Sequence, residues 1–501
     1  MTIRIAARAA ILPLILPLAG CLVGPDYQRP PPASPPAAHY KELAGWIPAA
    51  PADAAPKGDW WTDFHDPLLD QFEPQVRVSN QTVQADYHNY QEALALVQQA
   101  DAALFPTIGA TGSVTRAKGN GGSTGGGTSS AAMSSGTITE GTVEGTLSWQ
   151  PDIWGQVRRE IEENEANAQA SEATLANATL STQVTLATTV IDLRVTDADI
   201  DLLTRTVAEY TEYLRVVSNA VKAGYSLYPP SDEITARVQL ENAQASLIAL
   251  GVARAQYVHA IAVLVGKNPE DLDIPHSTAL PVLPYIPVGV PSALLQRRPD
   301  IAAAERTMEA QNAAIGVAIA AYYPNITISA DAGFSQAPLG TLFNTANDFW
   351  SIGAAGTETI FDFGERAAVV AEARAAYESA VATYRATVLS AFQGVEDNLA
   401  GLRILARQAA VLDAAVRDSR RGAEIARNEY SAGTVDYTTV ATAQATELSD
   451  EQNALNVQQS RLIDAASLIG DLGGGWSMAQ LHDAQDPGKP AQFDTQVSAT
   501  R

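Results

Sequence analysis

The sequence predicts a mainly α-helical protein with a small β part, built from a duplicated unit of helix, strand, strand, long helix and helix. Residues 156–223 and 365–432 are two proline-free stretches of 68 residues, and both their start and their end are displaced by 209 positions. Each stretch lies between two glycines, which are Gly155 and Gly224 in the first and Gly364 and Gly433 in the second. A shared register over this distance predicts a tandem duplication.

The two proline-free stretches are rich in Ala, Glu, Leu, Gln and Arg, which favour helices. At about 1.5 Å rise per residue, each uninterrupted helix would be roughly 100 Å long. That length is several times the roughly 30 Å hydrocarbon thickness of a bilayer. It predicts a body that crosses a gap rather than one that encloses a substrate pocket.

The N-terminus, residues 1–20, predicts a secretory signal peptide. Arg4 and Arg8 precede an apolar run at residues 9–18, and small residues follow it. The run is too short to span a bilayer, so a retained anchor helix is the weaker alternative.

Cys21 is the only cysteine of the chain, which excludes an intrachain disulfide. The order Leu18-Ala19-Gly20-Cys21 resembles the bacterial lipoprotein signal, in which the cysteine receives a covalent lipid and becomes the new N-terminus. Ordinary cleavage near an unremarkable cysteine is the alternative. Leu22 follows, in place of the aspartate associated with inner-membrane retention, so we expect Cys21 to be the lipid attachment site, anchored in outer-membrane lipid.

The composition excludes several classes of function. The net charge is −24 with 18% charged residues, so no basic patch is available for nucleic acid. No run approaches the length of a transmembrane helix, so a membrane crossing would need strands. The histidines and the lone cysteine have no metal-ligand spacing, and the glycines at 121–127 lack the lysine of a phosphate loop. We expect no metal, no cofactor other than the lipid, no catalytic residues and no enzyme activity.

The chain divides into six parts by proline content and periodicity. They are the signal peptide 1–20, an extended lipidated N-terminal segment 21–66, a first repeat 67–268, a proline-rich linker 269–298, a second repeat 299–472 and a C-terminal tail 473–501. In each repeat a helical pattern, at about 70–104 and at 300–323, stops at an aromatic residue followed by proline.

After each proline stop the periodicity changes to two. The strands are expected at about 107–116, 138–150, 326–335 and 349–361. Their alternation of apolar and polar residues is typical of outer-membrane barrel strands, although a half-buried strand of a soluble sheet has the same pattern. The loop at 117–135 is almost entirely Gly, Ser, Thr, Ala and Asn, which suits the outer mouth of a barrel.

A chain with four strands cannot span a membrane alone. Single-chain barrels of this type start at eight strands, and an open sheet edge is not tolerated in lipid. The chain must therefore oligomerise if it spans, and the strand pattern leaves two, three or four copies open.

The distal parts of the long helices have coiled-coil spacing. The first seam is Leu203, Val207, Tyr210, Leu214, Val217 and Val221, and the returning helix has Leu240, Ala243, Leu247 and Leu250. The counterpart of the first seam, 209 positions further on, begins at Leu412 and ends at Tyr430. Such seams favour antiparallel pairing of helices, and an ordinary core stripe is the alternative for any one of them.

Several motifs stand out along the chain. They are Trp60-Trp61 with Asp66-Pro67-Leu68, Leu294 to Ile301 with Glu305, Tyr323-Pro324, Ile360-Phe361-Asp362, Tyr430 with Gly433, and Leu472 to Trp476. Together they resemble the outer membrane efflux factors, the TolC-type channels, in their NodT/OprM-like lipoprotein branch. The resemblance covers nearly the whole chain. It implies a homotrimer with a twelve-stranded β-barrel, four strands from each chain, and an α-barrel in the periplasm. It also implies two partners, a periplasmic adaptor protein and an inner-membrane transporter.

The resemblance implies that the helix tips beside the turn glycines Gly224 and Gly433 close the tunnel. Tyr430 stands where the family has a gate tyrosine. Thr439 and Thr442 occupy the positions at which relatives carry ring aspartates, and Val435 replaces an arginine found in some relatives. The nearest acids are Asp436 in the second turn and Asp232 after the first. A solvated cap or turn residue is the alternative for Asp436.

The preferred interpretation is therefore the outer-membrane channel of a tripartite efflux system, a passive exit duct gated at its periplasmic tips. A structural or adhesive surface lipoprotein built on coiled coils is the alternative, but a fibre does not need alternating strands. A nutrient porin does not explain helices of this length. The sequence does not identify the transported molecules.

Overall fold

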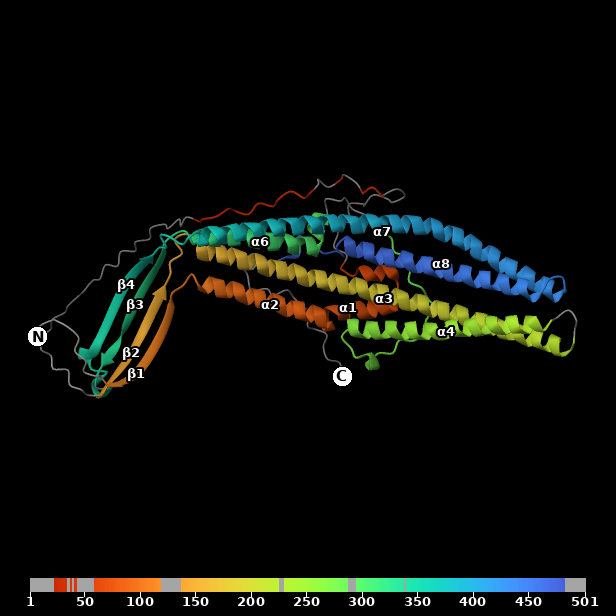
Figure 1. Cartoon of the computed structure of the whole chain (residues 1–501), viewed down its shortest axis with the longest axis horizontal. Helices are drawn as coiled ribbons and strands as arrows, with labels where there is room; N and C mark the ends of the chain where they lie inside the picture. The colour runs from red at the N-terminus through yellow and green to blue at the C-terminus, as the bar shows by residue number, and fades with distance from the viewer. Residues whose placement is uncertain are drawn as a thin grey trace, which may run out of the picture. The chain divides into compact units, whose positions relative to one another are not determined.

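The computed structural model describes residues 22–33, 37, 40–42, 58–118, 137–224, 229–286, 294–337 and 339–482. The first half contains α1 (Pro67–Ser79), α2 (Gln81–Ala102), β1 (Thr107–Lys118), β2 (Thr137–Trp149), α3 (Gln156–Lys222) and α4 (Pro230–Leu264). The second half contains α5 (Leu294–Arg297), α6 (Pro299–Ala320), β3 (Asn325–Gln336), β4 (Asp348–Thr357), α7 (Glu365–Ser431) and α8 (Tyr437–Asp471). The expected order of elements is present in both halves (Figure 1).

The helical pattern expected at about 70–104 is divided into α1 and α2. The break lies at Asn80, whose Oδ1 accepts the N–H groups of Thr82 and Val83 at 2.9 and 3.1 Å and so caps α2. Its Nδ2 donates to the carbonyl of Leu264 at 2.9 Å, which ties the break to the end of α4. Asn80 therefore stabilises this interruption, because its side chain caps the start of α2 and binds a free carbonyl at the end of α4.

The chain forms two compact units, and each contains parts of both repeats. Unit 1 consists of the described parts of Met1–Gln28, Ala93–Asn167 and Thr307–Ala380, which include the four strands. Unit 2 consists of the described parts of Arg29–Glu92, Ala168–Arg306 and Val381–Arg501, which include the distal helices. Repeats defined by sequence and units defined by packing therefore divide the chain differently.

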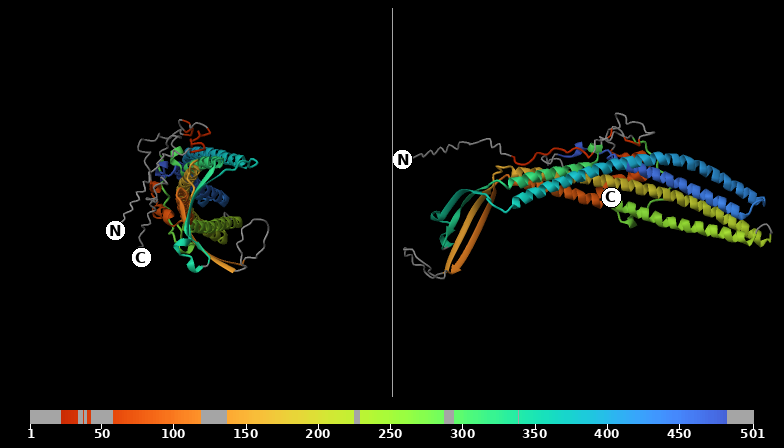
Figure 2. Two further views of the ribbon diagram at one scale, coloured as in Figure 1. Left: turned by 90° about the vertical axis from the view of Figure 1, so that its left-hand side faces the viewer. Right: turned by 45° about the horizontal axis from the view of Figure 1, so that its top comes forward.

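In unit 1 the strands form one antiparallel sheet in the order β1-β2-β3-β4, seen from other directions in Figure 2. Ile108 lies opposite Leu147, Leu147 opposite Ala330, and Ala330 opposite Ile352. Residues that share such a row lie on the same face, so apolar side chains form a continuous row across all four strands. Among the described residues no strand pairs with the outer edge of β1 or of β4.

In unit 2 the long helices form two antiparallel hairpins, α3 with α4 and α7 with α8 (Figures 1 and 2). Residues at the expected seam positions Tyr210, Val217, Leu240 and Ala243 are buried, as are Ala423, Ala426 and Tyr430. The two hairpins also pack against one another, because Ala236 of α4 shares a buried cluster with Tyr437 of α8. The seams thus lie inside this unit.

Candidate functional site at the helix tips and on the sheet

The tip of the second hairpin is closed by a tight turn at Gly433. This glycine has a φ of 74°, in the left-handed region that favours glycine. Its N–H donates to the carbonyl of Tyr430, and the next N–H, from Thr434, donates to the carbonyl of Glu429. Gly224 has a φ of 73° at the end of α3, and the residues after it, 225–228, lie outside the described residues. Both turn glycines thus have the backbone geometry that ends a helix.

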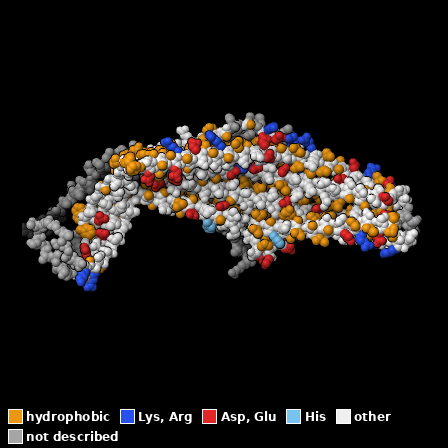
Figure 3. Space-filling model, in the orientation of Figure 1, with side chains coloured by type: hydrophobic (Ala, Val, Ile, Leu, Met, Phe, Trp, Pro, Cys, Tyr) orange, Lys and Arg blue, Asp and Glu red, His pale blue; other side chains and the backbone are white. Residues whose placement is uncertain are grey.

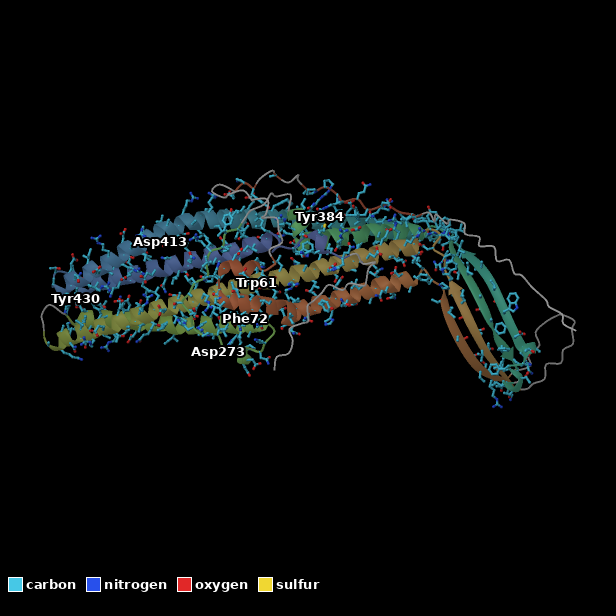
Figure 4. The ribbon with its side chains drawn as sticks, turned by 180° about the vertical axis from the view of Figure 1, so that it is seen from behind. Trp61, Phe72, Asp273, Tyr384, Asp413 and Tyr430 are labelled. Atoms are coloured by element: carbon cyan, nitrogen blue, oxygen red, sulfur yellow. The ribbon has the colours of Figure 1, made fainter. Side chains whose placement is uncertain are left out.

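A buried aromatic and aliphatic cluster joins the two hairpins next to these turns. Tyr430, near the end of α7 (Figure 4), packs edge-to-face on Tyr437 with ring centroids 5.6 Å apart. The ring centroid of Tyr213 of α3 lies 6.3 Å from that of Tyr437. The remaining buried members are Val217, Ala236, Ala426 and Val440. The candidate residue Tyr430 therefore contributes packing, and Tyr437 is the centre of the cluster.

Gln239 makes the polar link between the hairpins. The hydroxyl of Tyr437 donates to Oε1 of Gln239 at 3.1 Å, and Nε2 of Gln239 donates to the carbonyl of Ala441 at 3.3 Å. One amide of α4 thus binds α8 at two points. Neither Gln239 nor Tyr437 was among the residues expected from the sequence. The available signal was weak, because Gln239 is simply a polar residue beside the seam position Leu240.

Asp232 lies in the first turn of α4 and is buried, with 6% of its surface exposed. Oδ2 of its carboxylate is buried and has no hydrogen-bond partner among the described residues. Burial raises the pKa of Asp232, and the nearby carboxylate of Asp436 raises it further. The structure thus brings Asp232, Asp436 and Tyr437 together at one place.

Asp436 is the N-cap of α8. Its Oδ1 accepts the backbone N–H of Thr439 at 3.1 Å and the Thr439 hydroxyl at 2.9 Å. The hydroxyl of Thr442 donates to the carbonyl of Thr438 on its own helix at 2.8 Å. Asp436 and Thr439 therefore form a capping pair, and within the described part of the chain Thr442 makes no hydrogen bond to either of them. Asp436 thus has the geometry of a helix cap.

Three further links join the hairpins farther from the tip. Arg427 of α7 lies 3.4 Å from Glu209 of α3. Gln452 and Gln459 of α8 donate to Asp199 and Asp192 of α3, at 3.1 and 2.6 Å. Burial raises the pKa of both aspartates, and the hydrogen bond from each glutamine opposes this shift. The hairpins are thus joined by a ladder of polar contacts.

The sheet in unit 1 has one apolar and one polar face. On the apolar face Ile108, Trp350 and Ile352 are each at least 73% exposed. On the polar face Thr111 donates to Glu144 at 3.1 Å, and Ser351 donates to Asp331 at 3.0 Å. Large apolar side chains exposed to this degree are costly in water and favourable in a hydrocarbon environment.

Among the described residues there is no group of three His, Cys, Asp or Glu that could hold a metal ion. A groove of about 710 Å³ lies between α3, α7 and α8 and is lined by charged residues of both signs. Among them, Arg420 forms an ion pair with Glu451.

Cys21 lies outside the described residues. The segment after Cys21 is bound to the start of α3. The backbone N–H of Val23 donates to the carbonyl of Trp154, and the carbonyl of Val23 accepts from Nε of Arg159 of α3.

Helix α4 is long and apolar enough to cross a membrane, with a mean hydropathy of 1.6 in its most apolar window. It is the single such helix in the described part of the chain, and one helix of this kind is weak evidence for a span. Its exposed apolar residues are Ile234, Val238, Ile248, Val252 and Val263. In Figure 3 hydrophobic side chains gather along α4 and over the junction between β4 and α7.

A sheet with one apolar face, on a chain that also forms long helical hairpins, is the architecture of an outer-membrane channel subunit. Residues 74–267 and 290–474 match the family model for outer membrane efflux protein. The chain belongs to the outer membrane efflux protein family. It is the outer-membrane channel component of an efflux system, and this favours the channel over the alternative of an adhesive fibre.

Known relatives resemble the chain over nearly its full length. The solvent efflux pump outer membrane protein SrpC of Pseudomonas putida is 31% identical over 479 residues, covering 93% of this chain and 98% of SrpC. The probable outer membrane lipoprotein SilC of Salmonella typhimurium is 25% identical over 464 residues, covering 92% of this chain and 96% of SilC.

Solved structures have the same fold. The outer-membrane channel OprN matches with a TM-score of 0.82 and 26% identity, covering 91% of this chain and 100% of that one. The Campylobacter jejuni CmeC channel matches with a TM-score of 0.85 and 22% identity, covering 93% and 97%. The second likeness, at this identity, concerns the fold alone.

Proposed function

We propose that three copies of this chain form one exit duct, which a periplasmic adaptor and an inner-membrane transporter supply with small molecules. The observation that carries this proposal is the four-stranded sheet with one apolar face, whose two edges pair with no other strand in the described part of the chain. Edges left unpaired in lipid are too costly, so copies must pair them. The relatives named as efflux pump components support the partners.

Exposed apolar stripes on the hairpins support an association of copies. On α4 the members Ile234, Val238, Ile248 and Val252 follow the spacing of a helical seam. On α7 the exposed residues Ile404, Val411 and Ile425 lie seven and fourteen positions apart, so they share one face of a coiled-coil helix. Two such stripes on the two hairpins of one chain suit packing of α4 against α7 of the next copy.

Native mass spectrometry of the full chain in detergent tests the assembly, and three copies are expected. Co-purification after crosslinking in cells tests the partners, because an adaptor and a transporter should be recovered together with the chain. Recovery of a stable monomer alone would contradict the duct.

We infer that the tip closes through Gln239, Tyr437 and Asp232, with Tyr430 as packing and Asp436 and Thr439 as supports of the turn. Thr442 is bonded within its own helix. The contacts of Gln239 with α8 carry this inference, because any separation of the hairpins at the tip breaks them. Single-channel conductance in planar bilayers tests it. The closed wild-type channel should open more often when these contacts are removed.

We also propose that Cys21 is lipidated and anchors the chain in the outer membrane. The signal-like residues before it and the resemblance to the lipoprotein SilC support this. Mass spectrometry of the purified mature protein should find an acylated N-terminal Cys21. A mature N-terminus at another residue would exclude the anchor.

A further inference from the structure

One glutamine near the tip is buried without a polar partner. Gln444 of α8 is only 3% exposed. Neither Oε1 nor Nε2 of its side chain has a hydrogen-bond partner among the described residues. Buried side-chain amides are nearly always hydrogen-bonded, so an amide whose two polar atoms are both unpaired requires an explanation.

Gln444 lies on the stripe of α8 that holds the hairpins together. The buried residues in the first half of α8 are Tyr437, Val440 and Gln444, and their spacing of three and four positions places them on one face of the helix. Tyr437 and Val440 belong to the buried cluster that joins the two hairpins, and Ala441 and Ala443 pack against it. The unpaired amide therefore lies beside the contacts that keep the tip together.

The burial of this amide is complete within a single chain. Other atoms of the same chain cover both polar atoms of the Gln444 side chain. Neither solvent nor a neighbouring copy can reach these atoms until the helices that cover them move. The tip as it stands therefore has the full desolvation cost of the amide, because no hydrogen bond replaces those that water would make.

Gln239 is the contrasting amide of the same tip. Both of its polar atoms bind α8, one to the hydroxyl of Tyr437 at 3.1 Å and the other to the carbonyl of Ala441 at 3.3 Å. Separation of the hairpins would break the bonds of Gln239, but it would let water bind Gln444. One glutamine thus favours the closed tip, and the other opposes it.

We propose that Gln444 sets the balance between the closed and the open tip, because its unpaired amide makes the closed state less stable than an apolar side chain would. This inference rests on the proposed closure of the tip through Gln239 and Tyr437, and it adds the residue that opposes closure. A polar residue at a single core position of a coiled coil lowers stability in the same way. The result is a tip that a partner can open at a smaller cost in free energy.

Methionine substitutions in the full-length chain test this balance, because methionine is unbranched like glutamine but has no amide. Tyr437→Phe is used as the background, since its tip should open often enough for a change in either direction to be counted. In this background Gln444→Met should lower the ratio of open to closed channel at least about fivefold in single-channel recordings. Gln99→Met, at an exposed position of α2, is the control and should leave the ratio unchanged.

The same substitution at Gln239 should have the opposite effect. Gln239→Met in the otherwise unmodified chain removes two hydrogen bonds between the hairpins and should raise the ratio of open to closed channel. Opposite signs at two glutamines of one tip distinguish the amide from a general effect of methionine on packing. A higher ratio in Gln444→Met would show that this amide stabilises the closed tip and would overturn the proposal.

The outcomes separate the role of Gln444 from the closure of the tip. If Tyr437→Phe opens more often than the unmodified channel and Gln444→Met does not reduce that opening, the role of Gln444 is wrong and the closure stands. If neither Tyr437→Phe nor Gln239→Met opens more often than the unmodified channel, these contacts do not close the tip, and both inferences are wrong. Thermal unfolding followed by circular dichroism gives an independent measure, in which Gln444→Met should unfold at a higher temperature than the unmodified chain. A lower unfolding temperature would contradict the proposal.

Discussion

The hydroxyl of Tyr437 lies 3.1 Å from Oε1 of Gln239 and joins the first residue of α8 to the first third of α4. The two residues are 198 positions apart and belong to different repeats. This hydrogen bond is the contact of the tip cluster that is most sensitive to a movement of the helices, because a hydrogen bond is lost over a much smaller displacement than a hydrophobic contact.

Removing the Tyr437 hydroxyl should favour an open tip. Tyr437→Phe keeps the ring in the cluster and loses one hydrogen bond, worth about 0.5–1.5 kcal/mol, which corresponds to roughly a 2- to 12-fold higher ratio of open to closed channel. Single-channel recording measures this ratio. Tyr285→Phe, at an exposed position on the linker, is the matched control. An unchanged ratio in Tyr437→Phe would show that the hairpins are held elsewhere.

The tip should be less firmly closed at higher pH. Because burial raises the pKa of Asp232 above its ordinary value of 3.8, the closed tip binds the proton more tightly than an exposed carboxyl does. The closed state is therefore most favourable below pH 3.8 and loses stability as the pH rises through the raised pKa. Asp232→Asn should stay closed at neutral pH and flatten the pH profile of opening.

The control for this pH dependence is Asp273→Asn, which changes an exposed aspartate of the linker. Conductance recorded from pH 4 to pH 8 compares both variants with the unmodified channel. A profile in Asp232→Asn that follows the unmodified one would exclude Asp232 as the titrating group.

Neutralising the ladder between α3 and α8 should stabilise the protein at neutral pH. Burial raises the pKa of Asp199 above its ordinary value of 3.8, so the folded state favours the protonated carboxyl. The stability that the protonated form contributes is complete below pH 3.8 and is lost as the pH rises through the raised pKa. In Asp199→Asn the amide oxygen still accepts from Gln452. The unfolding temperature should rise at pH 7 and not at pH 3. The exposed Asp413→Asn should show no such difference, and a lower temperature for Asp199→Asn at pH 7 would contradict the argument.

The close approach of α7 and α8 should not tolerate a side chain at Gly394. A Cβ there would lie 2.6 Å from Oδ2 of Asp471. That carboxylate cannot easily move, because Arg298 and Asn398 both donate to it at 2.8 Å. Gly394→Ala should destabilise the fold by about 1–3 kcal/mol.

The matched change for Gly394 lies on the same helix. Gly422 has open space around its Cα, so Gly422→Ala should be neutral or stabilise α7 by up to about 1 kcal/mol. Thermal unfolding followed by circular dichroism compares the two variants. Equal effects would mean that helix propensity, and not the contact with Asp471, decides the outcome.

The large elements were predictable because they depend on short-range patterns. The proline-free stretches predicted α3 and α7, and period-two alternation predicted the four strands. The break at Asn80 was not predicted, because it depends on a hydrogen bond to Leu264, 184 positions away. β4 ends at Thr357, before the expected end at 361, because Asp362 accepts the N–H groups of Gly364 and Arg366 and already organises the start of α7.

The tip was predictable only in outline. Gly224 and Gly433 were visible because turn glycines are local features, whereas Tyr430 was named from the resemblance to the family. Gln239 and Tyr437 were missed because a glutamine beside a seam and a tyrosine at a helix start have no local signature. Asp436 could be identified as a possible cap from its place before a helix, and this is the geometry in the structure.

By itself, the sequence determined the duplication, the lengths of α3 and α7 and the two faces of the strands, since helix propensity, proline exclusion and alternation are properties of neighbouring residues. Only the tertiary structure decided which residues of α4 and α8 meet, how burial changes the ionisation of Asp232, and which two strands form the edges of the sheet. These features depend on segments about 200 positions apart in the sequence, and their contact is decided by packing rather than by any local preference.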